Sequence, residues 1–303
     1  MNRSLRAALL SSLAAFALAA SAPHTPAGGD ARAQTPAASA APQAQPTPQR
    51  DEKLWKRALA LHKKAIVVDG HNDIPSIMVD EDYDIGVPSA GKYHTDIARL
   101  KRGGMTGEFF SIYVDRQYAT PDWVSKNYVK EGGSARRALD LIDVTYRMVE
   151  KYPDDLTLAT STDDIRRAKR QGKVGVLMGI EGGHAIENSL SALREFYRLG
   201  VRYMTLTHNN TNEWADACCD EARHNGLSDF GKEVVREMNR TGILVDLSHV
   251  GNRTTKDAII HSEKPVAVTH ANPDSLFAHK RNKTDDVLKV LAEKGGVLGC
   301  ATY

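Results

Sequence analysis

Short apolar runs, suited to buried strands, alternate along this chain with amphipathic helical patterns, and this alternation restricts the fold more than any other feature. Parallel strands need a crossover connection, usually a helix, so the alternation predicts a parallel sheet covered by helices. The expected strands cover residues 66–70, 107–114, 174–180, 203–207, 243–248, 266–269 and 297–303. The expected helices cover residues 51–64, 134–151, 162–170, 189–199, 229–240, 252–261 and 285–293.

Two α/β architectures fit this pattern, a (β/α)8 barrel of the TIM type and an open doubly wound sheet. Five of the expected strands end in a side chain that could bind a metal ion or transfer a proton. In a barrel these strand ends meet around one axis, whereas an open sheet would spread them along a line. The pattern therefore favours the barrel.

The first strand ends in His-x-Asp, at His71 and Asp73. Residues two apart on a strand point to the same side, so an imidazole nitrogen and a carboxylate oxygen converge just beyond the last buried residue. Such a pair suits a divalent metal ion. Taken alone, the tripeptide fits equally well a strand end that carries two solvated polar residues.

Four further strands end in a candidate ligand, namely Glu181, His208, His249 and His270. Together with the His-x-Asp pair they exceed the four ligands of a single zinc ion, so the set indicates two metal ions bridged by one carboxylate. Glu181 is the expected bridge, because it stands alone between that pair and the later histidines. Asp246 lies three residues before His249, on the other side of its strand, and we expect it to have a structural or supporting role.

Several of these residues lie in longer recognisable segments. The segments are DGHND at 69–73, GIEGGHAI at 179–186, LGVRYMTLTHNNTNEWAD at 199–216, GILVDLSHV at 242–250, PVAVTHAN at 265–272 and RNKTDDVL at 281–288. In this order and spacing the chain resembles the membrane (renal) dipeptidase family of zinc peptidases, from about residue 60 to its end. The resemblance implies a (β/α)8 barrel with two Zn²⁺ ions.

The resemblance also implies which side chains bind the two ions. His71 and Asp73 would bind the first zinc ion, and Glu181 would bridge to the second. His249 and His270 would complete the second site. A metal-bridging hydroxide would then hydrolyse dipeptides, including dipeptides with a D- or dehydro residue on the carboxyl side.

Two residues remain for the substrate. His208 would stabilise the developing oxyanion, and the planar fork of Arg281 would bind the terminal carboxylate of the dipeptide. The resemblance further suggests a homodimer. One alternative is another two-metal barrel hydrolase that acts on lactones, cyclic amides or β-lactams; a second is an inactive metal-binding fragment.

The N-terminus has the features of a secretory signal peptide over residues 1–22. Arg3 and Arg6 form a basic region, residues 7–19 are apolar, and Ala20-Ser21-Ala22 is a small-residue cleavage site. We therefore expect a secreted or periplasmic protein with no membrane span after processing, since no later run supplies about 20 consecutive apolar residues. An uncleaved N-terminal anchor is the alternative.

Composition indicates how the chain is divided and which partners are unlikely. Residues 23–50 are mostly Ala, Pro, Gln, Thr and Ser, which predicts a disordered tether before a globular barrel domain at 51–303. Lys and Arg number 40 against 38 Asp and Glu, so no cationic excess favours a nucleic-acid partner. Because only seven strands are expected, we predict that the last strand and helix of the barrel are missing and that the chain is a piece of a longer enzyme.

Overall fold

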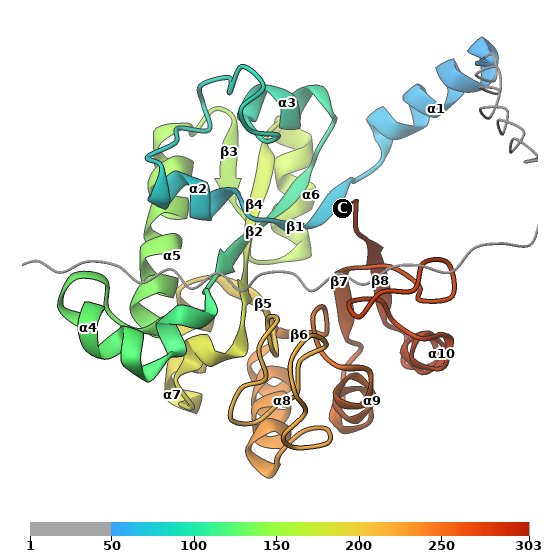
Figure 1. Cartoon of the computed structure of the whole chain (residues 1–303). Coiled ribbons are helices and arrows are strands. Elements are labelled where there is room, and N and C mark those ends of the chain that lie inside the picture. Colours follow the sequence, from blue (N-terminus) through green and yellow to red (C-terminus); the bar gives the residue numbers. More distant parts are fainter. Residues whose placement is uncertain (1–49, 303) are drawn as a thin grey trace, which may run out of the picture. The chain divides into compact units, whose positions relative to one another are not determined.

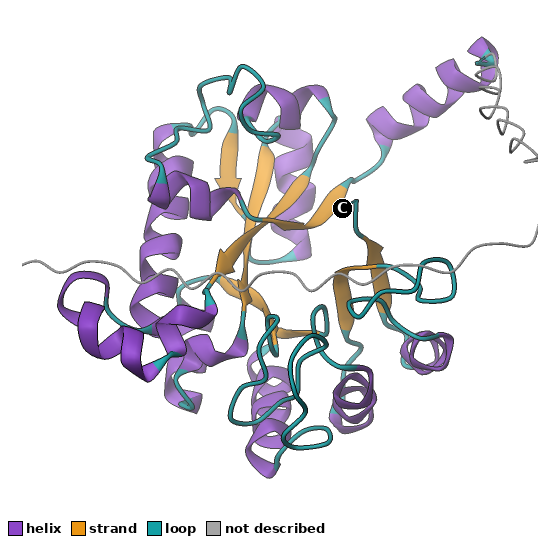
Figure 2. Cartoon of the chain, in the orientation of Figure 1, coloured by secondary structure: helices purple, strands orange, loops and turns teal. Residues whose placement is uncertain are grey.

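The computed structural model describes residues 50–302, and the residues from Asp51 onward form one compact unit. Parallel strands curve into a nearly closed barrel with helices around its outside (Figure 1, Figure 2). The strands are β1 (Val68–Asn72), β2 (Gly107–Tyr113), β3 (Leu156–Leu158), β4 (Val174–Glu181), β5 (Val201–Thr205), β6 (Leu244–Asp246), β7 (Ala267–Ala271) and β8 (Val297–Cys300). The expected signal peptide and nearly all of the expected tether lie outside the described residues.

Helices follow most of the strands along the chain. The α-helices are α1 (Glu52–Lys64), α2 (Ile74–Asp80), α3 (Ile97–Arg102), α4 (Pro121–Glu131), α5 (Ser134–Lys151), α6 (Thr162–Gln171), α7 (Leu190–Arg198), α8 (Asp229–Thr241), α9 (Asn252–His261) and α10 (Asp285–Glu293). Two short 3-10 helices, η1 (Arg116–Ala119) and η2 (Gly183–Ile186), complete the set within residues 50–302. All seven helices expected from the sequence are present, whereas α2, α3 and α4 were not predicted.

Seven strands form a continuous parallel path in the order β1-β2-β4-β5-β6-β7-β8. The eighth, β3, pairs with the first residues of β4 and lies beside the path. Within the described part of the chain no pairing joins β8 back to β1, so the barrel is not fully closed. The prediction of a barrel is confirmed and the open sheet is excluded. The prediction of seven strands missed β3, because three residues are too few to show a period.

Strand β4 shows why the strand sequences are so apolar. All eight of its residues are buried, as expected for a parallel strand covered on both faces. Gly179 is required within it, because a Cβ there would lie 2.1 Å from the ring of Tyr203 on the neighbouring strand. The glycine thus lets a large aromatic side chain fill the space beside the end of β4.

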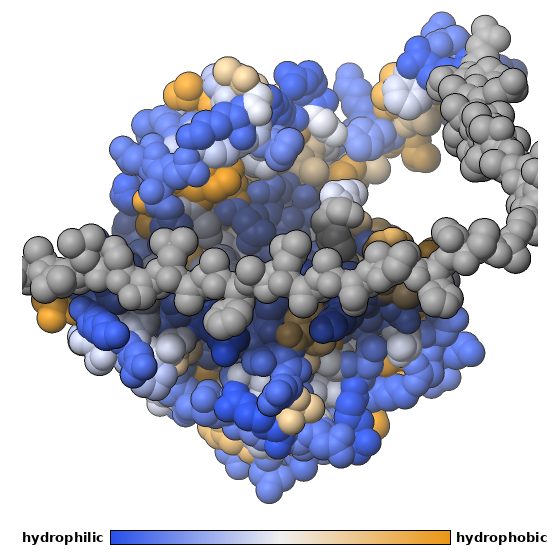
Figure 3. Space-filling view, in the orientation of Figure 1, coloured by the Kyte–Doolittle hydropathy of each residue, from blue (hydrophilic) through white to orange (hydrophobic). Residues whose placement is uncertain are grey.

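The outer helices bury one side and expose the other. Ser161 caps α6 by accepting a hydrogen bond from the backbone N–H of Asp164, and Gly172 ends the helix in the left-handed conformation. The face visible in Figure 3 is accordingly mostly hydrophilic. Helix α1 differs, because none of its side chains is buried and Leu54 and Leu61 are 60% and 69% exposed. No helix within residues 50–302 combines the length and apolar character needed to cross a bilayer.

The strand ends differ from the sequence prediction by two residues at two places. β5 ends at Thr205 and β6 at Asp246, so His208 and His249 each lie three residues past a strand and not directly after one. The other expected strand-end ligands, His71, Glu181 and His270, lie within β1, β4 and β7. All five side chains nevertheless reach one cavity at the carboxyl end of the barrel.

Candidate metal centre

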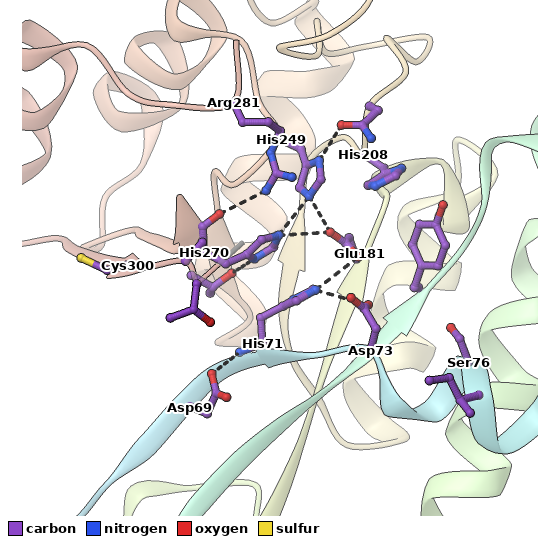
Figure 4. Close-up of a pocket in the computed structure, with 16 residues that line it drawn as sticks. Asp69, His71, Asp73, Ser76, Glu181, His208, His249, His270, Arg281 and Cys300 are labelled. Carbon is purple, nitrogen blue, oxygen red and sulfur yellow. Dashed lines mark hydrogen bonds and ion pairs between the residues drawn. The ribbon is translucent and has the colours of Figure 1, made fainter. Parts of the chain in front are cut away.

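A cavity of about 680 Å³ opens at the carboxyl ends of the barrel strands. Figure 4 shows the imidazole rings of His71, His249 and His270 gathered around the carboxylate of Glu181. Every residue that the sequence predicted for the site lines this cavity: His71, Asp73, Glu181, His208, His249, His270 and Arg281. Parallel strands therefore bring together residues that are up to 210 positions apart in the sequence.

Glu181 lies at the centre of the cluster. It is the last residue of β4 and is only 3% exposed. Its Oε2 lies 3.4 Å from Nε2 of His71, while its Oε1 lies 2.8 Å from Nε2 of His249 and 3.2 Å from Nε2 of His270. The two oxygens of one carboxylate thus face two different groups of nitrogen atoms, which is the arrangement expected of a bridging ligand.

His71 and Asp73 approach each other as the sequence predicted. Nε2 of His71 lies 3.3 Å from Oδ1 of Asp73, and the ring of His71 stacks on that of His270 with centroids 3.7 Å apart. Gly70 allows β1 to pass this close to β7, because a Cβ on Gly70 would lie 2.9 Å from the carbonyl oxygen of Thr269. The glycine in DGHND therefore brings the first and second halves of the site together.

His249 is held in an uncommon backbone conformation. Its φ is +61°, in the left-handed region that a non-glycine residue seldom adopts. Its carbonyl oxygen accepts hydrogen bonds from the backbone N–H of Cys218, at 2.7 Å, and from the hydroxyl of Thr207, at 3.3 Å. These contacts stabilise the turn after β6 and direct the imidazole to Glu181.

Each of the three histidines around Glu181 has a second partner on its other ring nitrogen. Nδ1 of His71 lies 3.0 Å from the hydroxyl of Tyr203, Nδ1 of His249 lies 2.8 Å from Oδ1 of Asn209, and Nδ1 of His270 lies 2.9 Å from Oγ1 of Thr269. Such partners fix the orientation of a metal-binding ring. These three partners were not predicted from the sequence. Only Asn209 and Thr269 could have been suspected from the sequence, because each is adjacent to a candidate histidine.

The charges of the cluster are strongly coupled. Burial alone would lower the pKa of His71, but Tyr203, Glu181 and Asp73 raise it well above its usual value. Burial likewise would raise the pKa of Glu181, but His71, His249 and His270 hold it well below its usual value. The carboxylate at the centre is therefore ionised and requires positive charge beside it.

The second group of candidate ligands includes a histidine without such a positive charge. Burial lowers the pKa of His249 to about 4, with Arg281 and His208 acting in the same direction, so its imidazole is neutral at neutral pH. Oδ1 of Asn209 lies 2.8 Å from Nδ1 of His249, and a hydrogen bond donated by Nδ1 to this oxygen would leave the lone pair of the ring on Nε2. Nε2 of His249, Oε1 of Glu181 and Nε2 of His270 lie within 3.2 Å of one another. Converging buried nitrogen and oxygen lone pairs of this kind fit a divalent metal ion such as Zn²⁺.

The grouping of the ligand atoms differs in one respect from the sequence prediction. Two sets of residues each have potential ligand atoms that all lie within 4.8 Å of one another. One set is His71, Glu181 and His270, and the other is Glu181, His208 and His249. His270 thus lies close to the predicted first site as well as the second. His208 lies close enough to serve as a ligand, although its assignment to the substrate stays a prediction.

His208 and Tyr113 form one wall of the cavity. The ring centroid of His208 lies 4.4 Å from that of His249 and 4.7 Å from that of Tyr113. Burial lowers the pKa of His208, so the ring is neutral and carries one N–H near neutral pH. The Tyr113 hydroxyl donates to Asp115 at 2.8 Å, which fixes the phenol against the histidine. The wall can therefore donate a hydrogen bond from His208 without adding charge.

Arg281 supplies the cationic part of the lining. Its Nη2 donates to the carbonyl oxygen of His270 at 3.2 Å, so the guanidinium is anchored to the strand that carries a predicted ligand. Its charge lowers the pKa of both His208 and His249, which locates it close to them. A fixed guanidinium beside a metal centre is suited to a carboxylate.

Comparisons with known proteins agree with this geometry. The family model "Membrane dipeptidase (Peptidase family M19)" matches residues 55–303. An amidohydrolase from Pseudomonas aeruginosa is 32% identical over 80% of this chain and 64% of its own, with a TM-score of 0.62. A metallo peptidase from Rhodobacter sphaeroides, solved with a phosphinate mimic of the dipeptide L-Ala-D-Ala, is 25% identical over 78% of this chain and 73% of its own, with a TM-score of 0.68.

A probable dipeptidase from Pseudomonas aeruginosa shares the fold. It is 22% identical over 83% of this chain and 63% of its own, with a TM-score of 0.74. The chain thus spans slightly less than two thirds of the length of two of these relatives.

Proposed function

The chain belongs to the membrane dipeptidase family, peptidase family M19, and from this premise we propose that it hydrolyses dipeptides with the help of two zinc ions. The observation that carries the proposal is the position of Glu181, whose two carboxylate oxygens face separate groups of imidazole nitrogens. His71 and Asp73 would hold one ion and His249 and His270 the other, with Glu181 shared. Bound zinc ions of this kind supply an activated water and polarise a carbonyl group.

The protein's own side chains would orient the substrate. Arg281 would bind the terminal carboxylate of the dipeptide through its planar fork, and its bond to the His270 carbonyl fixes the distance between this carboxylate and the ligands. A chain longer by one residue would place its carboxylate farther from the cut, so the arrangement favours dipeptides. The cavity of about 680 Å³ is of a size suited to such small ligands.

His208 would stabilise the charge that develops on the scissile carbonyl oxygen. As a neutral ring it keeps one N–H to donate, and its contact with Tyr113 fixes its plane. Removing one such donor typically costs about 3 kcal/mol of transition-state stabilisation. We therefore expect His208→Ala to lower kcat by about 100-fold while changing KM little.

We also propose that dipeptides with a D- or dehydro residue on the carboxyl side are substrates. The metallo peptidase from Rhodobacter sphaeroides, which binds a mimic of L-Ala-D-Ala, supports this specificity by similarity. L-Ala-D-Ala and L-Ala-L-Ala are therefore the first two substrates to compare.

The test is release of alanine from these dipeptides by the zinc-loaded chain, before and after treatment with a chelator. We expect activity that disappears with the metal and returns on adding zinc, and no activity in Glu181→Gln. Two bound zinc ions without hydrolysis of any dipeptide would refute the proposal and favour a binding protein.

The Arg281→Ala variant distinguishes a dipeptidase from a two-metal barrel hydrolase that acts on lactones, cyclic amides or β-lactams. The variant should raise KM for dipeptides by 10-fold or more, because a charge-assisted bond of about 1.5–3 kcal/mol is lost. A lactone or cyclic amide has no carboxylate for Arg281 to bind. If the parent chain prefers such a ring and the variant retains this preference, the dipeptidase proposal is wrong.

Two further proposals concern the state of the protein in the cell. We propose export to the periplasm or the medium, supported by the basic and apolar N-terminal segments at 3–6 and 7–19. N-terminal sequencing of the exported protein tests it and locates the cleavage. We also propose a homodimer, which light scattering of the purified protein would test.

A further inference from the structure

We propose that Asp246 determines which nitrogen of His270 carries the proton, through the hydroxyl groups of Ser248 and Thr269, and so leaves Nε2 of His270 free to bind a metal ion. We call Asp246, Ser248 and Thr269 the hydroxyl relay. Asp246 is a positioning residue in this proposal, since it does not touch the metal centre itself. The proposal rests on the metal-binding part of the proposed function, and its test separates the two.

The relay begins at a fully buried carboxylate. Asp246 is the last residue of β6 and has no exposed surface. Its Oδ2 accepts from the hydroxyl of Thr205 at 2.5 Å, and its Oδ1 accepts from the backbone N–H of Thr269 at 2.8 Å. The backbone N–H and the hydroxyl of Ser248 also donate to Oδ1, at 3.3 Å and 3.0 Å. Four donors thus surround one carboxylate, and an ionised carboxylate can only accept hydrogen bonds.

Each hydroxyl group in the relay has a single hydrogen and can therefore donate only one hydrogen bond. Ser248 must use its hydrogen toward Asp246, and its oxygen also accepts from the backbone N–H of His270 at 3.0 Å. In the 3.1 Å contact between the hydroxyls of Ser248 and Thr269, the donor is therefore Thr269. Thr269 has then used its own hydrogen as well.

The donor and acceptor roles of Ser248 and Thr269 therefore also determine the role of the His270 imidazole. Oγ1 of Thr269 lies 2.9 Å from Nδ1 of His270 and can only accept there, so Nδ1 carries the proton. When the ring carries a single proton, its lone pair then lies on Nε2, which is 3.2 Å from Oε1 of Glu181 and 3.0 Å from Nε2 of His249. The nitrogen that the relay leaves unprotonated is the one that faces the metal centre.

This relay differs from the partners of the other two histidines. The phenol of Tyr203 beside His71 can either donate or accept, and the amide of Asn209 beside His249 can reverse its oxygen and nitrogen. Neither partner by itself fixes a tautomer. Only the partner of His270 is connected to a carboxylate, among the contacts found in residues 50–302.

The backbone around the relay is held at close approach. A Cβ on Gly70 would lie 2.9 Å from the carbonyl oxygen of Thr269, and a Cβ on Gly299 would lie 2.2 Å from the same atom. β1 and β8 therefore enclose β7 at Thr269, and larger residues at either glycine would displace it. This close packing fixes the backbone of Thr269.

The test measures the tautomer directly in the zinc-free protein. Ring ¹⁵N–¹H correlation spectra at pH 8, above the usual imidazole pKa of about 6.5, distinguish a proton on Nδ1 from one on Nε2. We expect His270 in the parent chain to carry its proton on Nδ1. In Ser248→Ala the hydroxyl of Thr269 loses its acceptor and can donate to Nδ1, so we expect the Nε2–H form to increase.

Zinc affinity provides the second measurement. Loss of a partner of this kind typically weakens metal binding 10- to 100-fold, so we expect this loss for Ser248→Ala and for Thr269→Val. Thr269→Ser keeps the hydroxyl and should bind zinc within about 3-fold of the parent. Thr205→Val is the matched control, because it removes a hydroxyl from Asp246 without interrupting the relay. We expect it to leave the tautomer of His270 unchanged.

The outcomes are distinguishable. A proton on Nε2 of His270 in the zinc-free parent chain would overturn the proposal, as would an unchanged tautomer and zinc affinity in both Ser248→Ala and Thr269→Val. If one of these variants does not fold, the other and the rescue by Thr269→Ser decide. If the parent chain binds no zinc, the proposed function fails, while the tautomer still tests the relay.

Discussion

The buried carboxyl group of Glu108 should make the protein less stable as the pH rises. Glu108 lies on β2, has no exposed surface, and pairs in register with Asp69 on β1. Its Oε1 accepts from the amide of Asn72 at 2.7 Å, while its Oε2 is buried with no hydrogen-bond partner among the described residues. Burial, and next the charge of Asp69, raise the pKa of Glu108 to about 8.

The size of the effect follows from the two pKa values. The unfolded chain releases this proton near pH 4.5, and the folded chain only near pH 8. Between these values the folded state binds more protons, so the free energy of unfolding falls by about 1.4 kcal/mol per pH unit. The contribution is complete below about pH 4.5 and lost above about pH 8. Between pH 5 and pH 8 the expected loss is about 3.5 kcal/mol.

Glu108→Gln should abolish this loss, because the amide keeps an oxygen for Asn72 and cannot ionise. The assay is urea unfolding of the zinc-free protein at pH 5 and pH 8, for the parent chain and the variant. All other titrating groups are common to both, so the difference between the two pH dependences isolates Glu108 together with its interaction with Asp69. Glu150→Gln, on an exposed part of α5, is the matched control and should follow the parent chain. Parallel pH dependences of the parent and Glu108→Gln would refute the reasoning.

Three further perturbations test the packing and the metal centre. Gly179→Ala should lower the free energy of unfolding by at least about 1–3 kcal/mol in denaturant titrations, since its Cβ would lie 2.1 Å from the ring of Tyr203. Leu193→Ala, in the core, should cost about 2–5 kcal/mol in the same assay, whereas Val129→Ala, at a side chain 96% exposed, should change stability by less than about 0.5 kcal/mol. Zinc at 1,000 times its dissociation constant should stabilise the parent chain by about 4 kcal/mol, measured as a rise in Tm that Glu181→Gln largely removes.

The barrel and its ligand-bearing strands could be predicted because parallel strands buried on both faces give continuous apolar runs. β4 is such a run, and its last residue, Glu181, marks the point where the strand reaches the cavity. Strand β3 could not be predicted, because its three residues carry no period. Helices α2 and α3 are only seven and six residues long and gave no clear apolar stripe.

The residues that line the candidate site could be predicted more readily than their hydrogen-bond partners. A histidine or carboxylate after an apolar strand is visible in the sequence, but Tyr203 reaches His71 from a strand 132 residues away. Nothing in the segment around Tyr203 distinguishes it from an ordinary core aromatic residue. Its role depends on Gly179, which leaves room for the ring, and this pairing arises only from the register of β4 with β5.

Asp246 shows where reasoning from the period of a strand reaches its limit. Three residues separate it from His249, so strict alternation puts the two side chains on opposite sides and assigns Asp246 a supporting role. The strand ends at Asp246, however, and the chain then turns so that His249 adopts a φ of +61°. Alternation no longer applies past the strand end, because the turn reorients each following side chain. The carboxylate therefore remains buried beside β7, where it contacts Ser248 and the backbone of Thr269, while His249 turns into the cavity. The same turn that brings a candidate ligand to Glu181 thus leaves Asp246 behind a second candidate ligand, His270. In our proposal, this placement lets a buried carboxylate act on the candidate metal centre without facing it.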